Sequence, residues 1–101
     1  MRSITISYKF GGPEGEWRKM VGDFIAAIDG DPEVAGKITY QVATADDRET
    51  RIHWGRWDNQ DTLRTMQSRD YFKTFAERLR ELTGGQQNVM ASDVILKTSG
   101  W

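Results

Sequence analysis

The sequence predicts a single α+β domain of 101 residues whose elements follow the order β-α-β-β-α-β. Three observations predict this class. Residues 3–10 alternate between apolar and polar side chains, as a half-buried strand does. Residues 14–29 and 58–82 each carry apolar side chains at helical spacing, and two further β-rich segments lie between these stretches. The chain is too short for a second core, so residues 1–101 form one domain.

The first strand and the first helix have the clearest patterns. Gly11-Gly12-Pro13 separates them, and Asp29-Gly30 ends the helix. Asp31-Pro32 is typical of one further short turn. The apolar residues of the strand and then of the helix are Ile4, Ile6, Tyr8 and Phe10, followed by Trp17, Met20, Val21, Phe24, Ile25 and Ile28.

The two middle segments predict a hairpin. Residues 37–43 alternate, with Ile38, Tyr40 and Val42 on one face, and residues 45–48 are a polar connection to a return strand over 50–57. In the return strand, alternation separates Ile52, Trp54 and Arg56 from His53. The apolar character of the first set predicts that it faces the helices and that His53 faces away from them.

The second helical region is expected to be kinked. Asp58 or Asn59 can cap its first turn, and Ser68 lies where a second cap would fall. Gly84-Gly85 ends the region. The last strand is expected over residues 89–98, with Val94, Ile95 and Leu96 at its centre.

This order of elements predicts the ferredoxin-like arrangement. Two right-handed β-α-β crossovers interleave into a four-stranded antiparallel sheet with both helices on one face. The other face of the sheet is then left to water or to a partner subunit.

Composition excludes several classes of function. With 14 basic and 15 acidic side chains and a net charge of −1, no basic patch indicates nucleic-acid binding. The absence of cysteine excludes disulfides, thiolate catalysis and zinc–sulfur sites. No apolar run is long enough to span a membrane and no signal peptide is evident, so a cytoplasmic protein is expected.

The segment from Trp57 to Phe75 resembles the antibiotic biosynthesis monooxygenase type of dimeric α+β barrel. The residues that carry the resemblance are Trp57-Asp58, Leu63, Ser68, Tyr71-Phe72 and Phe75. The resemblance implies a homodimer in which two sheets pair into a barrel, and a ligand pocket between the sheet and helices of each subunit. The homodimer is expected to use the face that bears Ser3, Thr5, Ser7, Thr39, Gln41 and His53.

The resemblance does not extend to haem chemistry. The haem-degrading branch of this superfamily relies on a tryptophan and a haem-ligating histidine in the second helix. The nearest positions here hold Thr65 or Met66, and Phe75 or Ala76. Without an axial histidine no haem is expected, and no other cofactor or metal site is predicted.

Two polar residues of the return strand have alternative interpretations. His53 is the only histidine and titrates nearest neutrality, so it is a candidate base, a subunit-interface residue or a hydrogen-bonded structural residue. Arg56 can anchor an anionic oxygen, or it can face solvent paired with Asp58 or Glu49.

Aromatic residues on the helix-facing side indicate either a packed core or an apolar pocket with phenol groups in it. If it is a pocket, the candidate catalytic residues are Tyr8, Tyr40, Arg56 and Tyr71. The candidate ligand-binding residues are Trp17, Phe24, Trp54, Met66 and Phe72.

Two functions remain open on this basis. The first is a cofactor-independent oxygenase acting on an aromatic, quinone or polyketide-like small molecule, whose own electron-rich anion reacts with oxygen. The second is a non-catalytic small-ligand-binding or interaction domain on the same dimeric scaffold.

Overall fold

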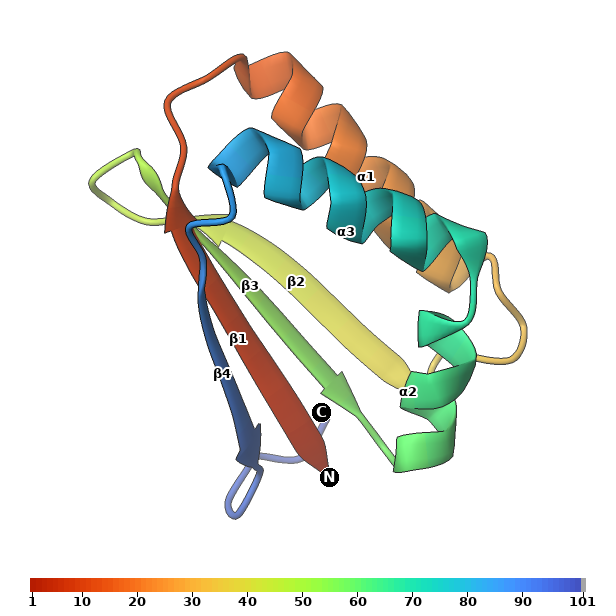
Figure 1. Cartoon of the computed structure of the whole chain (residues 1–101). Helices are drawn as coiled ribbons and strands as arrows, with labels where there is room; N and C mark the ends of the chain where they lie inside the picture. The colour runs from red at the N-terminus through yellow and green to blue at the C-terminus, as the bar shows by residue number, and fades with distance from the viewer. Residues whose placement is uncertain (101) are drawn as a thin grey trace.

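A computed structural model describes residues 1–100 of the chain, and its element order is β-α-β-β-α-β with the second helix divided in two (Figure 1). The elements are β1 (Arg2–Lys9), α1 (Glu14–Asp29), β2 (Ile38–Thr44), β3 (Thr50–Trp57), α2 (Gln60–Gln67), α3 (Asp70–Thr83) and β4 (Asn88–Asp93). Over these residues no helix has both the length and the apolar character that a membrane span requires.

The four strands form one antiparallel sheet in the order β2-β3-β1-β4. Helices α1 and α3 lie side by side over one face of this sheet, and α2 sits at its end, beyond β3 (Figure 1). The predicted ferredoxin-like fold is therefore confirmed.

The core lies between the sheet and the two long helices, and Phe24 is at its centre. The Phe24 ring stacks on Phe75 at a centroid distance of 3.9 Å and meets Tyr40 edge-on at 5.2 Å. Trp17 and Ile28, one on either side along the same stripe of α1, are buried in the same cluster. The apolar stripe predicted for this helix therefore faces the sheet.

The prediction for the faces of β3 is wrong. His53 faces the helices, is fully buried and lies 5.9 Å from the Phe75 ring. Because side chains alternate along a strand, Ile52, Trp54 and Arg56 lie on the opposite face. Gly55 lies on the same inner face as His53. A Cβ atom at this position would lie 3.0 Å from the Tyr40 ring, so the glycine leaves room for the tyrosine.

The second helical region is broken at Ser68 and Arg69. Asn59 caps α2, since its side-chain oxygen accepts hydrogen bonds from the backbone N–H groups of Asp61 and Thr62 at 3.0 and 3.1 Å. The expected interruption is confirmed, but Ser68 does not cap α3. It ends α2 and donates its hydroxyl to the Thr65 carbonyl at 2.6 Å, and Arg69 takes the cap position of α3.

Replacing Asn59 by alanine should therefore destabilise the protein by about 1 kcal/mol, because two backbone donors lose their acceptor. Chemical denaturation measures the loss. Asn59→Asp keeps an acceptor and should stay within a few tenths of a kcal/mol of the parent. An equal loss in both variants would contradict the capping role.

The last strand is shorter than predicted. β4 ends at Asp93, and the expected centre of the strand lies beyond it, with Ile95 and Leu96 exposed by 85% and 88%. Residues 88–93 pair with β1, and the Val94 N–H donates one more hydrogen bond, to the Met1 carbonyl at 3.0 Å. Ile95 and Leu96 therefore lie beyond the sheet.

Candidate ligand site

A chain of four hydrogen-bonded side chains connects β1, α1, β3 and β2. The Trp17 indole donates its N–H to the Tyr8 hydroxyl at 2.7 Å. The Tyr8 hydroxyl contacts Nε2 of His53 at 2.7 Å, and the Tyr40 hydroxyl contacts Nδ1 of the same ring at 2.7 Å. His53 thus has a phenol on each ring nitrogen.

The strand register brings these groups together. His53 pairs with Ile6 on one side and with Val42 on the other. Tyr8 and Tyr40 are each two residues from those partners, so they are its diagonal neighbours on the same face of the sheet, within reach of long side chains. The contact of His53 with the two tyrosines was not predicted from the sequence. The alternation of side chains did place both tyrosines on the helix-facing side of their strands.

Burial keeps this chain of side chains uncharged. Desolvation lowers the pKa of His53 to about 4, and it raises the pKa of both Tyr8 and Tyr40. Near neutral pH the imidazole is therefore neutral, with one N–H and one bare nitrogen.

A cavity of about 150 Å³ lies between the sheet and helices α2 and α3. Its walls include Tyr40, which thereby connects it to His53, and Gln67 is the one exposed side chain among the described residues that line it. No charged residue is part of the described wall. The lining residues are Ile4, Ile6, Phe24, Ile38, Tyr40, Gly55, Trp57, Leu63, Met66, Gln67, Phe72 and Phe75.

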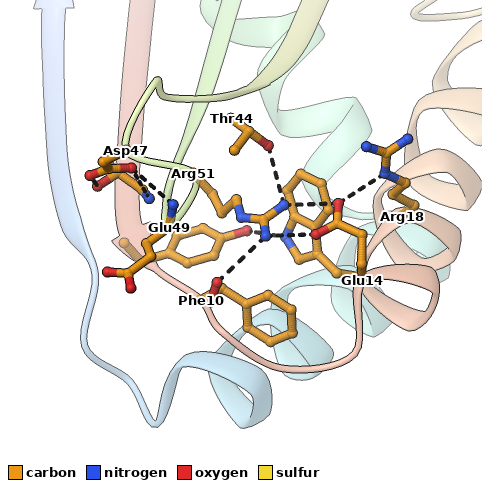
Figure 2. Close-up of polar contacts among 10 residues, drawn as sticks. Phe10, Glu14, Arg18, Thr44, Asp47, Glu49 and Arg51 are labelled. Carbon is orange, nitrogen blue, oxygen red and sulfur yellow. Dashed lines mark hydrogen bonds and ion pairs between the residues drawn. The ribbon is translucent and has the colours of Figure 1, made fainter.

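An ion pair anchors the far end of the hydrogen-bonded chain. Arg51 forks onto Glu14, with N···O distances of 2.7 and 3.0 Å, and also contacts Thr44 and the Phe10 carbonyl (Figure 2). Its guanidinium lies 4.3 Å from the centre of the Trp17 ring. Hydrogen bonds from Arg51 and Arg18 lower the pKa of Glu14 to about 2, so the pair is charged near neutral pH.

The predicted site residues fall into separate places. Four of them, Tyr40, Phe24, Met66 and Phe72, line the cavity. Two more, Tyr8 and Trp17, lie behind its wall in the hydrogen-bonded chain.

The remaining three predicted residues lie away from the cavity. Trp54 and Arg56 are on the opposite face of the sheet, where the guanidinium sits 5.3 Å from the centre of the Trp54 ring. The expectation that they project toward the helices is wrong. His53 points toward the helices, and because side chains alternate along a strand, Trp54 and Arg56 point to the other side. Arg56 is also only 3% exposed, so the alternative of a solvent-facing arginine is wrong.

Tyr71 belongs to a different polar cluster, which the sequence did not reveal. Its hydroxyl donates to Asp31 at 2.8 Å, and Arg69 donates to the same carboxylate at 3.0 Å. These bonds, led by the one from Arg69, lower the pKa of Asp31, and burial together with the Asp31 contact raises the pKa of Tyr71 to about 12.

Within residues 1–100 no group of three or more acidic or histidine side chains is placed to hold a metal ion.

The protein is thus a small α+β domain with an apolar cavity between its sheet and its helices. Searches with the sequence give no match to any protein-family model or to any curated protein. Comparison of structures does give matches over nearly the whole chain. A variant of SnoaB, a cofactor-independent oxygenase from Streptomyces nogalater, matches with a TM-score of 0.78 at 14% identity, covering 97% of this chain and 96% of that one.

Two further structures agree with this match. Rv0793 from Mycobacterium tuberculosis has a TM-score of 0.76 at 12% identity over 98% of this chain and 100% of its own. An antibiotic biosynthesis monooxygenase has a TM-score of 0.72 at 11% identity over 95% and 100%. The resemblance found in the sequence is thus confirmed as a likeness of fold, and at these identities the likeness concerns the fold alone.

Proposed function

We propose that this protein is a small cofactor-independent oxygenase that acts on an aromatic molecule bound between its sheet and helices. The observation that carries the proposal is the apolar cavity, one wall of which is Tyr40, whose hydroxyl is hydrogen-bonded to His53. The fold shared with SnoaB, described as a cofactor-independent oxygenase, supports it.

The stoichiometry of such a reaction needs no cofactor. An aromatic compound with an acidic CH₂ group loses a proton to water, and the resulting carbanion gives one electron to O₂. The two radicals combine to a peroxide anion, which takes a proton back and becomes a hydroperoxide. Loss of water leaves a carbonyl, so that R₂CH₂ and O₂ become R₂C=O and H₂O. An apolar chamber protects the anion from water, and a fixed donor stabilises its oxygen.

In this proposal Tyr40 contacts the substrate, whereas Tyr8 and Trp17 act through His53 as positioning residues. Phe24, Met66 and Phe72 supply the apolar walls. Arg56 and Tyr71 take no part in the proposed chemistry, because neither lines the cavity.

A non-catalytic ligand-binding domain is the second candidate. The pKa of about 4 favours it, because an imidazole that is so weakly basic, flanked by two phenols, is a poor general base.

Oxygen uptake separates the two candidates. An oxygen electrode should record one O₂ consumed per molecule when the protein meets one-ring and two-ring aromatic ketones with acidic CH₂ groups. Loss of one oxyanion donor in Tyr40→Phe should lower the rate by about 10²-fold. Saturable binding without any oxygen uptake would instead support the ligand-binding domain.

We also propose that two copies pair through the sheet face opposite the helices. This face carries Trp54 and Ile52 among small polar side chains of β1 and β2, and its edge strand adds Met90, which is 71% exposed. A second copy covers this apolar group and the exposed edge. His53, which was expected on this face, is not part of it.

Sedimentation at micromolar concentration should accordingly detect a dimer. Trp54→Arg places a charge in the proposed interface and should shift the protein to monomers while its far-ultraviolet circular dichroism is unchanged. Lys19→Ala, on the exposed side of α1, is the control and should leave the dimer intact. A parent protein that sediments as a monomer would refute the proposed pairing.

A further inference from the structure

The helix-facing side of the sheet is incompletely covered by the protein's own side chains. Ile4 and Ile6 lie on this side of β1, which has a strand paired along each edge, and both pack against the buried core. They are nevertheless only partly buried, whereas Tyr8, on the same side of the same strand, is 3% exposed. Both isoleucines line the cavity of about 150 Å³, so apolar side chains at the middle of the sheet have open space beside them.

The surface of this cavity is almost entirely carbon. Of the described lining residues, only Tyr40, Trp57 and Gln67 carry a polar side-chain atom. The Tyr40 hydroxyl is hydrogen-bonded to Nδ1 of His53 at 2.7 Å, and the Trp57 indole nitrogen is fully buried. Gln67 is exposed at the surface of the molecule. Apart from Gln67, the described wall therefore offers a ligand neither a hydrogen-bond partner nor a counter-charge.

This surface decides which chemical groups can enter. A hydroxyl, carbonyl or ring nitrogen that moves from water into the cavity loses its hydrogen bonds to water and gains none from the wall, which is costly. An ionised group loses far more. A hydrocarbon group has no such bonds to lose, and it gains from leaving water in proportion to its apolar area. The cavity therefore favours hydrocarbon and disfavours every polar substituent.

The wall also favours a ring over an alkyl chain, because five of its described residues are aromatic. Phe24 stacks on Phe75 with 3.9 Å between the ring centroids, and Tyr40 stands edge-on to Phe24 at 5.2 Å. An aromatic guest can add to such a group through offset-stacked or edge-to-face contacts. An apolar cavity of about 150 Å³ holds a molecule of the size of benzene, so the space takes one ring. The five aromatic residues are Phe24, Tyr40, Trp57, Phe72 and Phe75.

We propose that the cavity is a binding site for an unsubstituted aromatic hydrocarbon ring, and that it rejects rings whose buried part carries a hydroxyl, a carbonyl or a charge. The ring belongs to a larger molecule whose polar groups are at its other end. That this molecule is a substrate rests on the proposed function, whereas the selection of the ring rests on the wall alone. A phenyl ketone fits this description, and a hydroxyquinone does not.

Methionine methyl groups report where a small ring binds. Met66 lines the cavity, whereas Met20 and Met90 are not part of its described wall. Benzene added to protein with ¹³C-labelled methionine methyls should shift the Met66 resonance saturably and leave the other two nearly unchanged, because the ring current of the guest acts over a short distance. Absence of a Met66 shift up to the solubility limit of benzene, or equal shifts at all three methionines, would overturn the site.

A matched pair of ligands tests the exclusion of polar groups. Benzene and pyrazine have nearly the same shape, but pyrazine has nitrogen acceptors at opposite ends, so at least one of them faces the wall whichever way the ring enters. Benzene should bind at least about tenfold more tightly, the effect of one buried acceptor without a partner. Titration of the Met66 shift measures both affinities. Equal affinities, or tighter binding of pyrazine, would overturn the exclusion and show that a donor faces the cavity.

Leu63 provides the variants that tie binding to this space. It lines the cavity from α2 and is only partly buried. Leu63→Trp fills the cavity and should abolish the benzene shift at Met66, whereas Leu63→Met conserves the volume and should retain it. Far-ultraviolet circular dichroism checks that both variants are folded. Benzene binding that survives in folded Leu63→Trp would overturn the site, and if that variant does not fold, the two titrations of the parent protein decide.

Oxygen uptake separates this inference from the proposed function. 1-Phenyl-2-propanone has an unsubstituted ring and an acidic CH₂ group, and its 4-hydroxyphenyl analogue adds a hydroxyl at the end that enters the cavity. The KM of the analogue should be about tenfold higher. If both ketones consume oxygen with equal KM, the oxygenase stands and the selection of the ring is refuted. If benzene is preferred over pyrazine but neither ketone consumes oxygen, the selection stands and the oxygenase proposal gives way to the ligand-binding domain.

Discussion

Replacing Phe24 by alanine should destabilise the protein by about 3–5 kcal/mol, the largest single-residue effect we expect in the core. The ring is 3% exposed, stacks on Phe75 and meets Tyr40 edge-on, so its loss removes contacts with the sheet and with α3 together. Phe24 also lines the cavity, so truncation enlarges a space that already exists and the walls have little to collapse onto. Urea unfolding of parent and variant measures the difference.

Ile25 provides the matched control because it is the next residue on the same helix but only partly buried. Ile25→Ala should cost clearly less than Phe24→Ala, since less apolar area leaves water when this residue folds into place. A loss below about 1 kcal/mol for Phe24→Ala, or equal losses for the two variants, would contradict the central position of the Phe24 ring.

Much of the fold was predictable because its signals are local. The alternation of β1 and the helical stripe from Trp17 to Ile28 each follow from one periodicity, and the glycine at position 84 ends α3 in the left-handed conformation as expected. The break near Ser68 was also predictable, but which residue caps which helix was not. Asn, Ser and Asp side chains can all serve as caps, and the choice depends on where the chain turns.

The site was harder to predict because it depends on pairing between strands. In β3 the apolar residues Ile52 and Trp54 point away from the helices, and a histidine points into the core. Apolar character alone assigns such a strand to the wrong face. The fully buried position is stable for His53 because two tyrosines from neighbouring strands satisfy both of its nitrogens, and this becomes visible only with the register.

Contacts between residues distant in sequence were missed for the same reason. The Arg51–Glu14 pair spans 37 residues, and the Tyr71–Asp31 bond spans 40. Each contact joins a strand or a loop to a helix that is distant in sequence. The periodicity of one element does not indicate which other element it contacts. Charged residues at such positions look like solvated surface until the packing of the elements is known.

The buried histidine leads to a pH dependence of stability. The pKa of His53 is about 4 in the folded protein, against 6.5 for an unperturbed histidine. Between these values the unfolded chain binds a proton at this residue and the folded protein does not, so the free energy of unfolding rises with pH. The contribution of His53 is complete above about pH 6.5 and is lost as the pH falls toward 4. The shift corresponds to about 3 kcal/mol.

A glutamine at position 53 isolates this effect. His53→Gln retains a donor and an acceptor for the two tyrosines but does not titrate, whereas every carboxylate of the protein stays in place. Glu14 and Asp47, whose pKa values are lowered to about 2, also destabilise the fold on acidification, but they do so in both proteins. Urea unfolding at a series of pH values should therefore show a stability difference, parent minus variant, that falls by about 3 kcal/mol from pH 6.5 to pH 4. A difference that is constant over this range would mean that burial does not hold His53 in its neutral form.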